Sequence, residues 1–139
     1  MKKIVLVVLT FIFCSGFTDL SPDIKLTGAG LQEETELEGQ KATKFSEGVV
    51  FKIKGQELSS HIAFYVKNKT LLAEEFVVFK MGSGQVITAD VFTYDERKEI
   101  GHFTSHVQVK TGKTSTGNTS AYNSLDYNFK TGQIQTPRQ

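Results

Sequence analysis

The sequence is poor in cysteine, and its one cysteine lies close to the start. Cys14 is the only cysteine among 139 residues, and it falls within an apolar segment that we expect to be removed. Disulfides then contribute nothing to the remaining domain, although they are common in exported proteins. Processing to a lipid-anchored protein needs a small residue before the cysteine, and Phe13 stands there. We therefore expect no lipid anchor at Cys14.

Proline is scarce, and neither sign of charge is in excess. The two prolines, Pro22 and Pro137, lie near the ends of the chain, so they remove no hydrogen-bond donor from the strands expected between them. The chain has 16 Lys and Arg against 15 Asp and Glu, and removing Lys2 and Lys3 leaves 14 against 15. Such a balance lacks the basic footprint of a nucleic-acid-binding protein. We therefore expect no nucleic acid among the partners.

No apolar run is long enough to cross a membrane. Lys2 and Lys3 precede an apolar run that starts at Ile4, and the small pair Ser15-Gly16 follows it. Even extended to Phe17 the run has 14 residues, whereas a spanning helix needs about 20. A basic start, a short apolar stretch and small residues at its exit are typical of a secretory signal peptide. The sequence predicts a signal peptide over residues 1–17, cleaved near Gly16, and a periplasmic location; retention as an anchor is the alternative.

The motifs of the common enzyme classes are missing. The chain has no nucleophile elbow, no phosphate-binding glycine loop and no zinc-protease helix. Its only histidines are His61, His102 and His106. On one strand the last two would stand about 13 Å apart, too far to bind one metal ion together. We therefore expect no enzyme, no cofactor and no metal site.

The pattern of the chain becomes that of a β protein from Lys41 onward. β-Branched and aromatic residues alternate with turns rich in Gly, Asn and Lys about every ten residues. No window keeps the apolar spacing of an amphipathic helix. Residues 18–40, with an acidic stretch from Glu33 to Glu38, are weakly patterned and read as a leader or loose lead-in strand. The sequence thus predicts one all-β domain over residues 41–139.

An internal repeat is the most informative feature of the sequence. Val49, Val78 and Val107 are spaced 29 residues apart and begin similar segments. Tyrosines recur in the same frame: Tyr65, Tyr94 and, after a four-residue insertion, Tyr127. One such unit cannot bury its apolar face alone, so units must stack and pair their backbones. The repeat predicts an open, elongated stack of short strands.

The faces and ends of this stack raise two further expectations. In the segment Val86 to Tyr94, Ala89 and Val91 share one face whereas Phe92 and Tyr94 share the other, which predicts a β-bulge near Val91. The chain stops soon after its third repeat with no obvious cap. An uncapped strand edge invites strand addition from another subunit. We therefore expect a homo-oligomer or assembly with similar subunits.

One part of the repeat resembles a known family. The phrase GQVITADVFTYDERKEI followed by HVQVK resembles the repeat of the OstA-like lipopolysaccharide-transport domain. Thr88-Ala89-Asp90, Tyr94-Asp95, Val107 and Val109 match the pattern, and YNFKTGQIQTP looks like the end of such domains. The resemblance covers about residues 37–139.

The resemblance implies both a fold and a function. The fold is an open β-jellyroll, or β-taco solenoid, of stacked short antiparallel strands around an apolar trough. The function is that of a periplasmic carrier that shields the acyl chains of lipopolysaccharide and bridges inner- and outer-membrane machinery, joined to other β-jellyroll subunits by edge-strand addition. Together with the repeat, it implies that the trough wall includes Val49, Phe51, Val78, Ala89, Val107 and Val109.

Two other functions fit the same residues. The chain could be a membrane-tethered subunit of the same export machine, if its N-terminal segment is kept as an anchor. It could also be a structural β-solenoid that packs its apolar residues fully and binds only proteins. The aromatic side chains do not separate these alternatives, because a stacked sheet needs them in either case.

Overall fold

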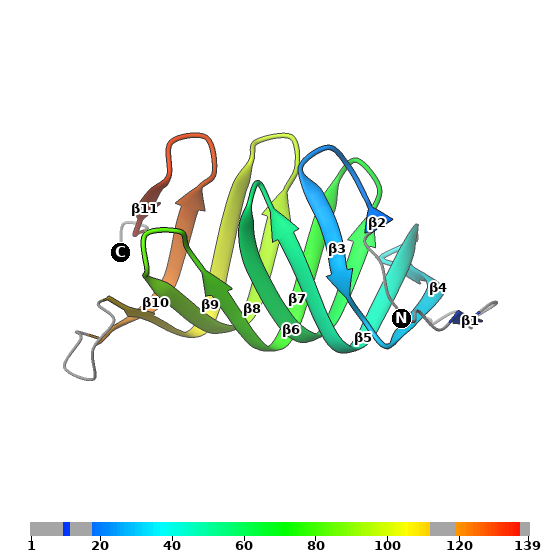
Figure 1. Ribbon diagram of the computed structural model, residues 1–139, viewed down its shortest axis with the longest axis horizontal. Coiled ribbons are helices and arrows are strands. Elements are labelled where there is room, and N and C mark those ends of the chain that lie inside the picture. Colours follow the sequence, from blue (N-terminus) through cyan, green and yellow to red (C-terminus); the bar gives the residue numbers. More distant parts are fainter. Residues whose placement is uncertain (1–9, 12–17, 112–118, 137–139) are drawn as a thin grey trace.

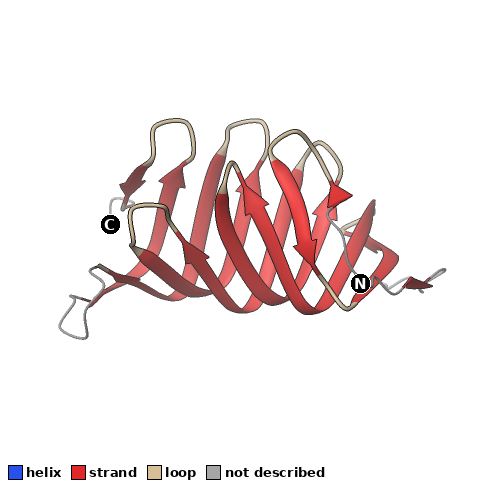
Figure 2. Ribbon diagram, viewed as in Figure 1, coloured by secondary structure: helices blue, strands red, loops and turns tan. Residues whose placement is uncertain are grey.

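The computed structural model describes residues 10–11, 18–111 and 119–136, and within them the protein is all-β. Eleven strands form one antiparallel sheet, and these residues contain no helix (Figures 1 and 2). The strands are β1 (Thr10–Phe11), β2 (Thr18–Asp19), β3 (Ile24–Gly28), β4 (Leu31–Leu37), β5 (Gln40–Ile53), β6 (Gln56–Val66), β7 (Thr70–Lys80), β8 (Val86–Asp95), β9 (Ile100–Lys110), β10 (Thr119–Asn128) and β11 (Gln133–Gln135). The predicted all-β class and open jellyroll or taco fold are confirmed.

The sheet folds over on itself because its long strands bend. Strands β5 to β11 pair in sequence order, β4 and β3 pair with different halves of β5, and the register shifts in the middle of each of β5 to β9. Phe45 and Phe51 lie six residues apart on β5, about 20 Å along a straight strand, yet their ring centroids are 5.7 Å apart. The bend therefore brings the two halves of the strand face to face.

The two halves are called here the first and the second arm. The first arm contains β2, β3 and residues 49–53, 56–60, 77–80, 86–89, 107–110 and 119–122; the second contains β4, β11 and residues 40–46, 62–66, 70–74, 91–95, 100–104 and 124–128. The strands curve round along the lower margin of Figure 1, and most of the turns line its upper side. We call the side where the turns of the two arms meet the mouth.

Left-handed backbone conformations produce the bends on alternate strands. The pairs Glu47-Gly48, Glu75-Phe76 and Ser105-His106 all have positive φ, and they lie at the register shifts of β5, β7 and β9. Only glycine adopts this conformation without cost, and for each other residue it costs about 1–2 kcal/mol of conformational free energy. Five of these six residues are not glycine, so the packing between the arms has to offset local strain.

The middle bend corrects one position of the predicted repeat. Val77, and not Val78, follows the Glu75-Phe76 pair and is fully buried, whereas Val78 lies on the outer face and is partly exposed. The repeat intervals are therefore 28 and 30 residues rather than 29 and 29. A slip of one residue turns a strand side chain to the opposite face. The bulge predicted near Val91 is confirmed, since the β8–β9 register shifts between Thr88 and Val91.

The segment expected to be a loose lead-in is part of the packed fold. β3 pairs with β5, and its side chains Ile24 and Leu26 belong to the core with 0% and 2% exposure. β4 pairs with the other half of β5 along its whole length. The packed unit therefore includes residues before Lys41. The sequence pattern did not predict these two strands because each contains few apolar residues.

Of the predicted signal peptide, only Thr10–Phe11 belongs to the described residues, where it pairs as β1 with β4. The proposed cleavage point near Gly16 and Cys14 lie outside the described residues. Within the described part of the chain there is no helix with the length and apolar character that a bilayer crossing requires.

Gly101 gives a sharp test of how closely the side chains of the second arm pack against its backbone. A methyl group at Gly101 would lie 2.5 Å from Phe92 Cε1 and 3.0 Å from Phe129 Cε1. Both rings are buried, so Gly101→Ala is expected to lower the free energy of unfolding by about 1–3 kcal/mol. Urea denaturation measures this change.

Gly82 is the matched control for this substitution. It lies in the β7–β8 turn with no atom within 4 Å of the added methyl. Gly82→Ala is expected to change the free energy of unfolding by less than about 0.5 kcal/mol. Equal losses for the two variants would contradict close packing at Gly101.

Candidate functional site

The space between the arms is lined by five of the six residues predicted for the trough wall. Val49, Phe51 and Val107 have no exposed surface, and Ala89 and Val109 are 5% and 6% exposed. All five belong to one core cluster. Val78 does not join them, because it lies on the outer face of β7, where its cross-strand partners are Ser59 and Thr88.

This interior is filled by side chains from both arms. Phe79 of the first arm contacts four rings of the second arm and its turn, with centroids 5.3 to 6.3 Å apart: Phe92, Phe103, Tyr127 and Phe129. Phe92 and Phe103 also meet each other at 4.7 Å. The trough is therefore closed in this conformation, and a ligand can enter it only if the arms separate.

The repeated tyrosines form a row just inside the mouth. Cross-strand neighbours run from Tyr65 through Leu71, Tyr94 and Gly101 to Tyr127. We call Tyr65, Tyr94 and Tyr127 the tyrosine row. All three are at least 95% buried, and a tyrosine places an apolar ring in a core and a polar tip at its boundary. The regular spacing of tyrosines in the sequence therefore arises because each one lies at the boundary between the core and the mouth.

The outer hydroxyls of the tyrosine row have partners, whereas the middle one does not. The Tyr65 hydroxyl donates to Glu96 Oε1 at 3.0 Å and lies 3.4 Å from the Leu20 carbonyl. The Tyr127 hydroxyl accepts a hydrogen bond from Gln56 Nε2 at 2.7 Å. The Tyr94 hydroxyl is buried with no hydrogen-bond partner.

Burial and nearby carboxylates both act on the ionisation of Tyr94. Desolvation, followed by the negative charges of Asp23, Glu99 and Glu96, raises the pKa of Tyr94 far above its ordinary value. Desolvation likewise raises the pKa of Tyr65. Both phenols therefore keep their protons at neutral pH and can donate hydrogen bonds.

An ion pair links the turns of the two arms above this row. Lys54 of the β5–β6 turn places its Nζ 2.9 Å from Glu99 Oε1 in the β8–β9 turn and 3.9 Å from Asp23 Oδ1. The hydrogen bond to Glu99 is the main cause of a raised pKa for Lys54. Because all three side chains are partly exposed, this contact adds little stability, although it connects the turns of the two arms at the mouth.

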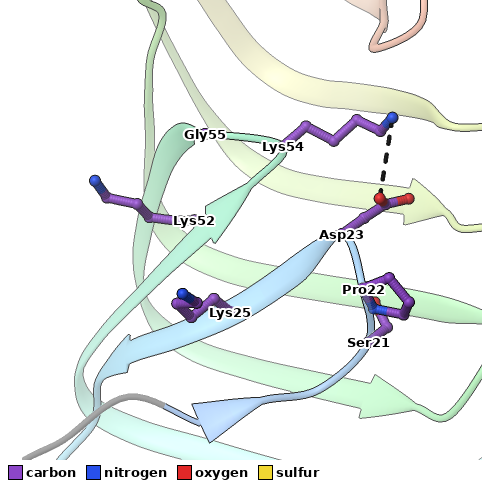
Figure 3. A pocket seen from close by; sticks show the side chains of 7 residues that line it. All are labelled: Ser21, Pro22, Asp23, Lys25, Lys52, Lys54 and Gly55. Carbon is purple, nitrogen blue, oxygen red and sulfur yellow. Dashed lines mark ion pairs between the residues drawn. The ribbon is translucent and has the colours of Figure 1, made fainter.

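A shallow pocket lies beside this ion pair on the first arm. Its volume is about 320 Å³, and its lining consists of Ser21, Pro22, Asp23, Lys25, Lys52, Lys54 and Gly55. Figure 3 shows Lys54 and Asp23 pointing toward one another while Lys52 points away from them. The lysines do not converge on a common point, so the pocket has no evident anion-binding geometry.

The histidines lie on the outer face of the sheet, His61 and His106 at bends and His102 on the second arm. His106 Nδ1 lies 2.6 Å from Asp90 Oδ2, and His102 contacts Asp126. The hydrogen bond from His106 lowers the pKa of Asp90. Phe76, beside His61, is 71% exposed. In the described part of the chain no three His, Asp or Glu side chains are grouped to hold a metal ion.

No protein-family model matches this chain, and no curated protein is significantly similar to it. The OstA-like resemblance therefore stays a prediction. The sequence did not single out Lys54, Gln56 and Glu99, which make polar contacts between the arms at the mouth. In the sequence these residues stand in or beside polar turns. Turns that are merely exposed to solvent have the same composition, so the pattern does not distinguish these residues.

Proposed function

We propose that this protein is a periplasmic carrier of lipopolysaccharide or a similar lipid, and that it shields acyl chains between its two arms. The observation that carries this proposal is the division of the inner surface. A continuous apolar lining covers both arms, and it ends at the tyrosine row and the charged turns of the mouth. Acyl chains fit the apolar lining, and sugars and phosphates can remain in water beyond the charged turns of the mouth.

Such a carrier needs no catalytic group. Each CH₂ removed from water contributes about 0.8 kcal/mol, so a single long chain supplies several kcal/mol toward separating the arms. The strand bends, with their left-handed residue pairs, are the natural hinge, because the ladder hydrogen bonds are already interrupted there.

Strand addition at the sheet edges supports the second half of the proposal, assembly into a bridge. Among the described residues, β11 pairs only with Asp126–Asn128 of β10. The stretch from Thr119 to Leu125 pairs with β9 on its other side. Its other edge has no partner strand among the described residues, and it can accept a strand from another copy or from a β-jellyroll subunit of the same machine.

The filled interior favours a competing function. If the arms never separate, the protein is a structural β-solenoid that binds other proteins through its edges and outer face. The aromatic contacts of Phe79 across the two arms fit that alternative directly.

A retention assay separates the two functions. Purified protein is mixed with radiolabelled lipopolysaccharide and passed through a sizing column, and the carrier is expected to co-elute with label. The matched control is the same lipopolysaccharide with its acyl chains removed, which is expected not to co-elute. Equal retention of both forms, or of neither, would leave the structural solenoid as the better account.

A further inference from the structure

We propose that the Tyr94 hydroxyl is a polar subsite of the trough that forms when the arms separate, and that it donates a hydrogen bond to the carbonyl or hydroxyl oxygen at the root of a bound acyl chain. This inference rests on the proposed lipid-carrier function and names the part of the lipid that the mouth recognises. The residue stands on the second arm, in the middle of the tyrosine row.

The first argument is that this hydroxyl has no partner in the free protein. Tyr94 is fully buried, and its hydroxyl makes no hydrogen bond. Buried polar groups are nearly always paired, so each exception needs an explanation. Its two equivalents in the repeat do have partners: Tyr65 contacts Glu96, and Tyr127 contacts Gln56. A ligand oxygen would give Tyr94 the partner that its equivalents already have.

The second argument is the position of the hydroxyl between apolar and polar surroundings. Below Tyr94, toward the bend, its strand continues with Phe92, and Phe129 packs on the Tyr94 ring at 5.0 Å. The charged side chains Asp23 and Glu99, at the mouth, act on its hydroxyl. In acylated lipids the ester or amide group lies at the same kind of boundary, between hydrocarbon and head group.

The third argument concerns the charge of the ligand atom. The charged groups acting on the hydroxyl are four carboxylates: Asp23, Glu99, Glu96 and Asp95. Lys54 offsets part of the charge of Asp23 and Glu99, but four carboxylates outnumber this one ammonium. Their net negative charge repels an anionic oxygen and keeps the phenol protonated and able to donate. A neutral acceptor such as an ester or amide carbonyl fits this field, whereas a phosphate oxygen does not.

Tyr94→Phe tests the subsite, because it removes one oxygen and leaves the ring in place. In the free protein the substitution breaks no hydrogen bond, so urea denaturation is expected to give an unchanged or slightly higher midpoint. The affinity for radiolabelled lipopolysaccharide is expected to fall about tenfold, the effect of losing one hydrogen bond. Unlabelled ester-linked phospholipid is expected to compete better than its ether-linked analogue for the wild-type protein, and equally well for Tyr94→Phe.

Tyr127→Phe is the control, because it removes a hydroxyl that already accepts a hydrogen bond from Gln56. This variant is expected to lose stability and to keep the preference for the ester-linked lipid. If Tyr94→Phe binds lipopolysaccharide as tightly as the wild type, the carrier stands and the subsite is overturned. If Tyr94→Phe destabilises the free protein strongly, the hydroxyl has a structural partner and the subsite is also overturned. If the wild type retains no lipopolysaccharide, the carrier function fails and the subsite fails with it.

Discussion

Val77→Glu is expected to unfold the protein, and Val78→Glu is expected to leave it folded. Val77 is fully buried in the core between the arms, so a glutamate there loses its hydration without gaining a partner. Such burial costs several kcal/mol, a large share of the stability of a small domain. Val78 lies on the outer face, where the carboxylate reaches water. Circular dichroism with urea denaturation measures both variants.

The comparison also tests the corrected repeat. The 29-residue spacing placed Val78 in the trough wall, whereas the bend at Glu75-Phe76 places Val77 there. Loss of folding in Val78→Glu with a stable Val77→Glu would show that the bend lies one residue further along β7.

Phe79→Ala is expected to lower the free energy of unfolding by about 3–5 kcal/mol. Phe79 is fully buried and its ring lies between the arms, where it contacts four other aromatic rings. Removing it leaves a cavity that the surrounding rings cannot all fill. Urea denaturation at equal protein concentration compares the variant with the wild type.

Phe76→Ala is the matched control, since Phe76 is on the same strand and is 71% exposed. Its free energy of unfolding is expected to change by less than about 0.5 kcal/mol. A loss at Phe76 as large as the loss at Phe79 would mean that the outer face of the bend is covered in solution.

The strand pattern of this protein could be predicted from sequence because its strands are long and regularly spaced. The period-two pattern, together with the parity change between Ala89 and Phe92, led correctly to a bulge near Val91. Five of the six residues proposed for the trough wall lie on the inner face for the same reason. The tyrosine spacing was visible as well, but only the register shows that it forms a row.

Other features depend on contacts that a sequence does not record. The left-handed pair Glu75-Phe76 contains no glycine, so nothing in its composition marks the bend, and the repeat was misaligned there by one residue. Ile24 and Leu26 sit in a short strand with few apolar neighbours in sequence, and their burial comes from pairing with the distant end of β5. Lys54 and Glu99 meet only because the sheet folds over.

Site-specific crosslinking tests the central claim, that lipid acyl chains enter between the arms. Benzoylphenylalanine replaces Phe51 on the inner face in one variant and exposed Phe76 in another, and each folded variant is irradiated with radiolabelled lipopolysaccharide. The carrier predicts a strong crosslink from position 51 and little or none from position 76. A folded protein that gives no crosslink from position 51, or equal crosslinks from both positions, would contradict it.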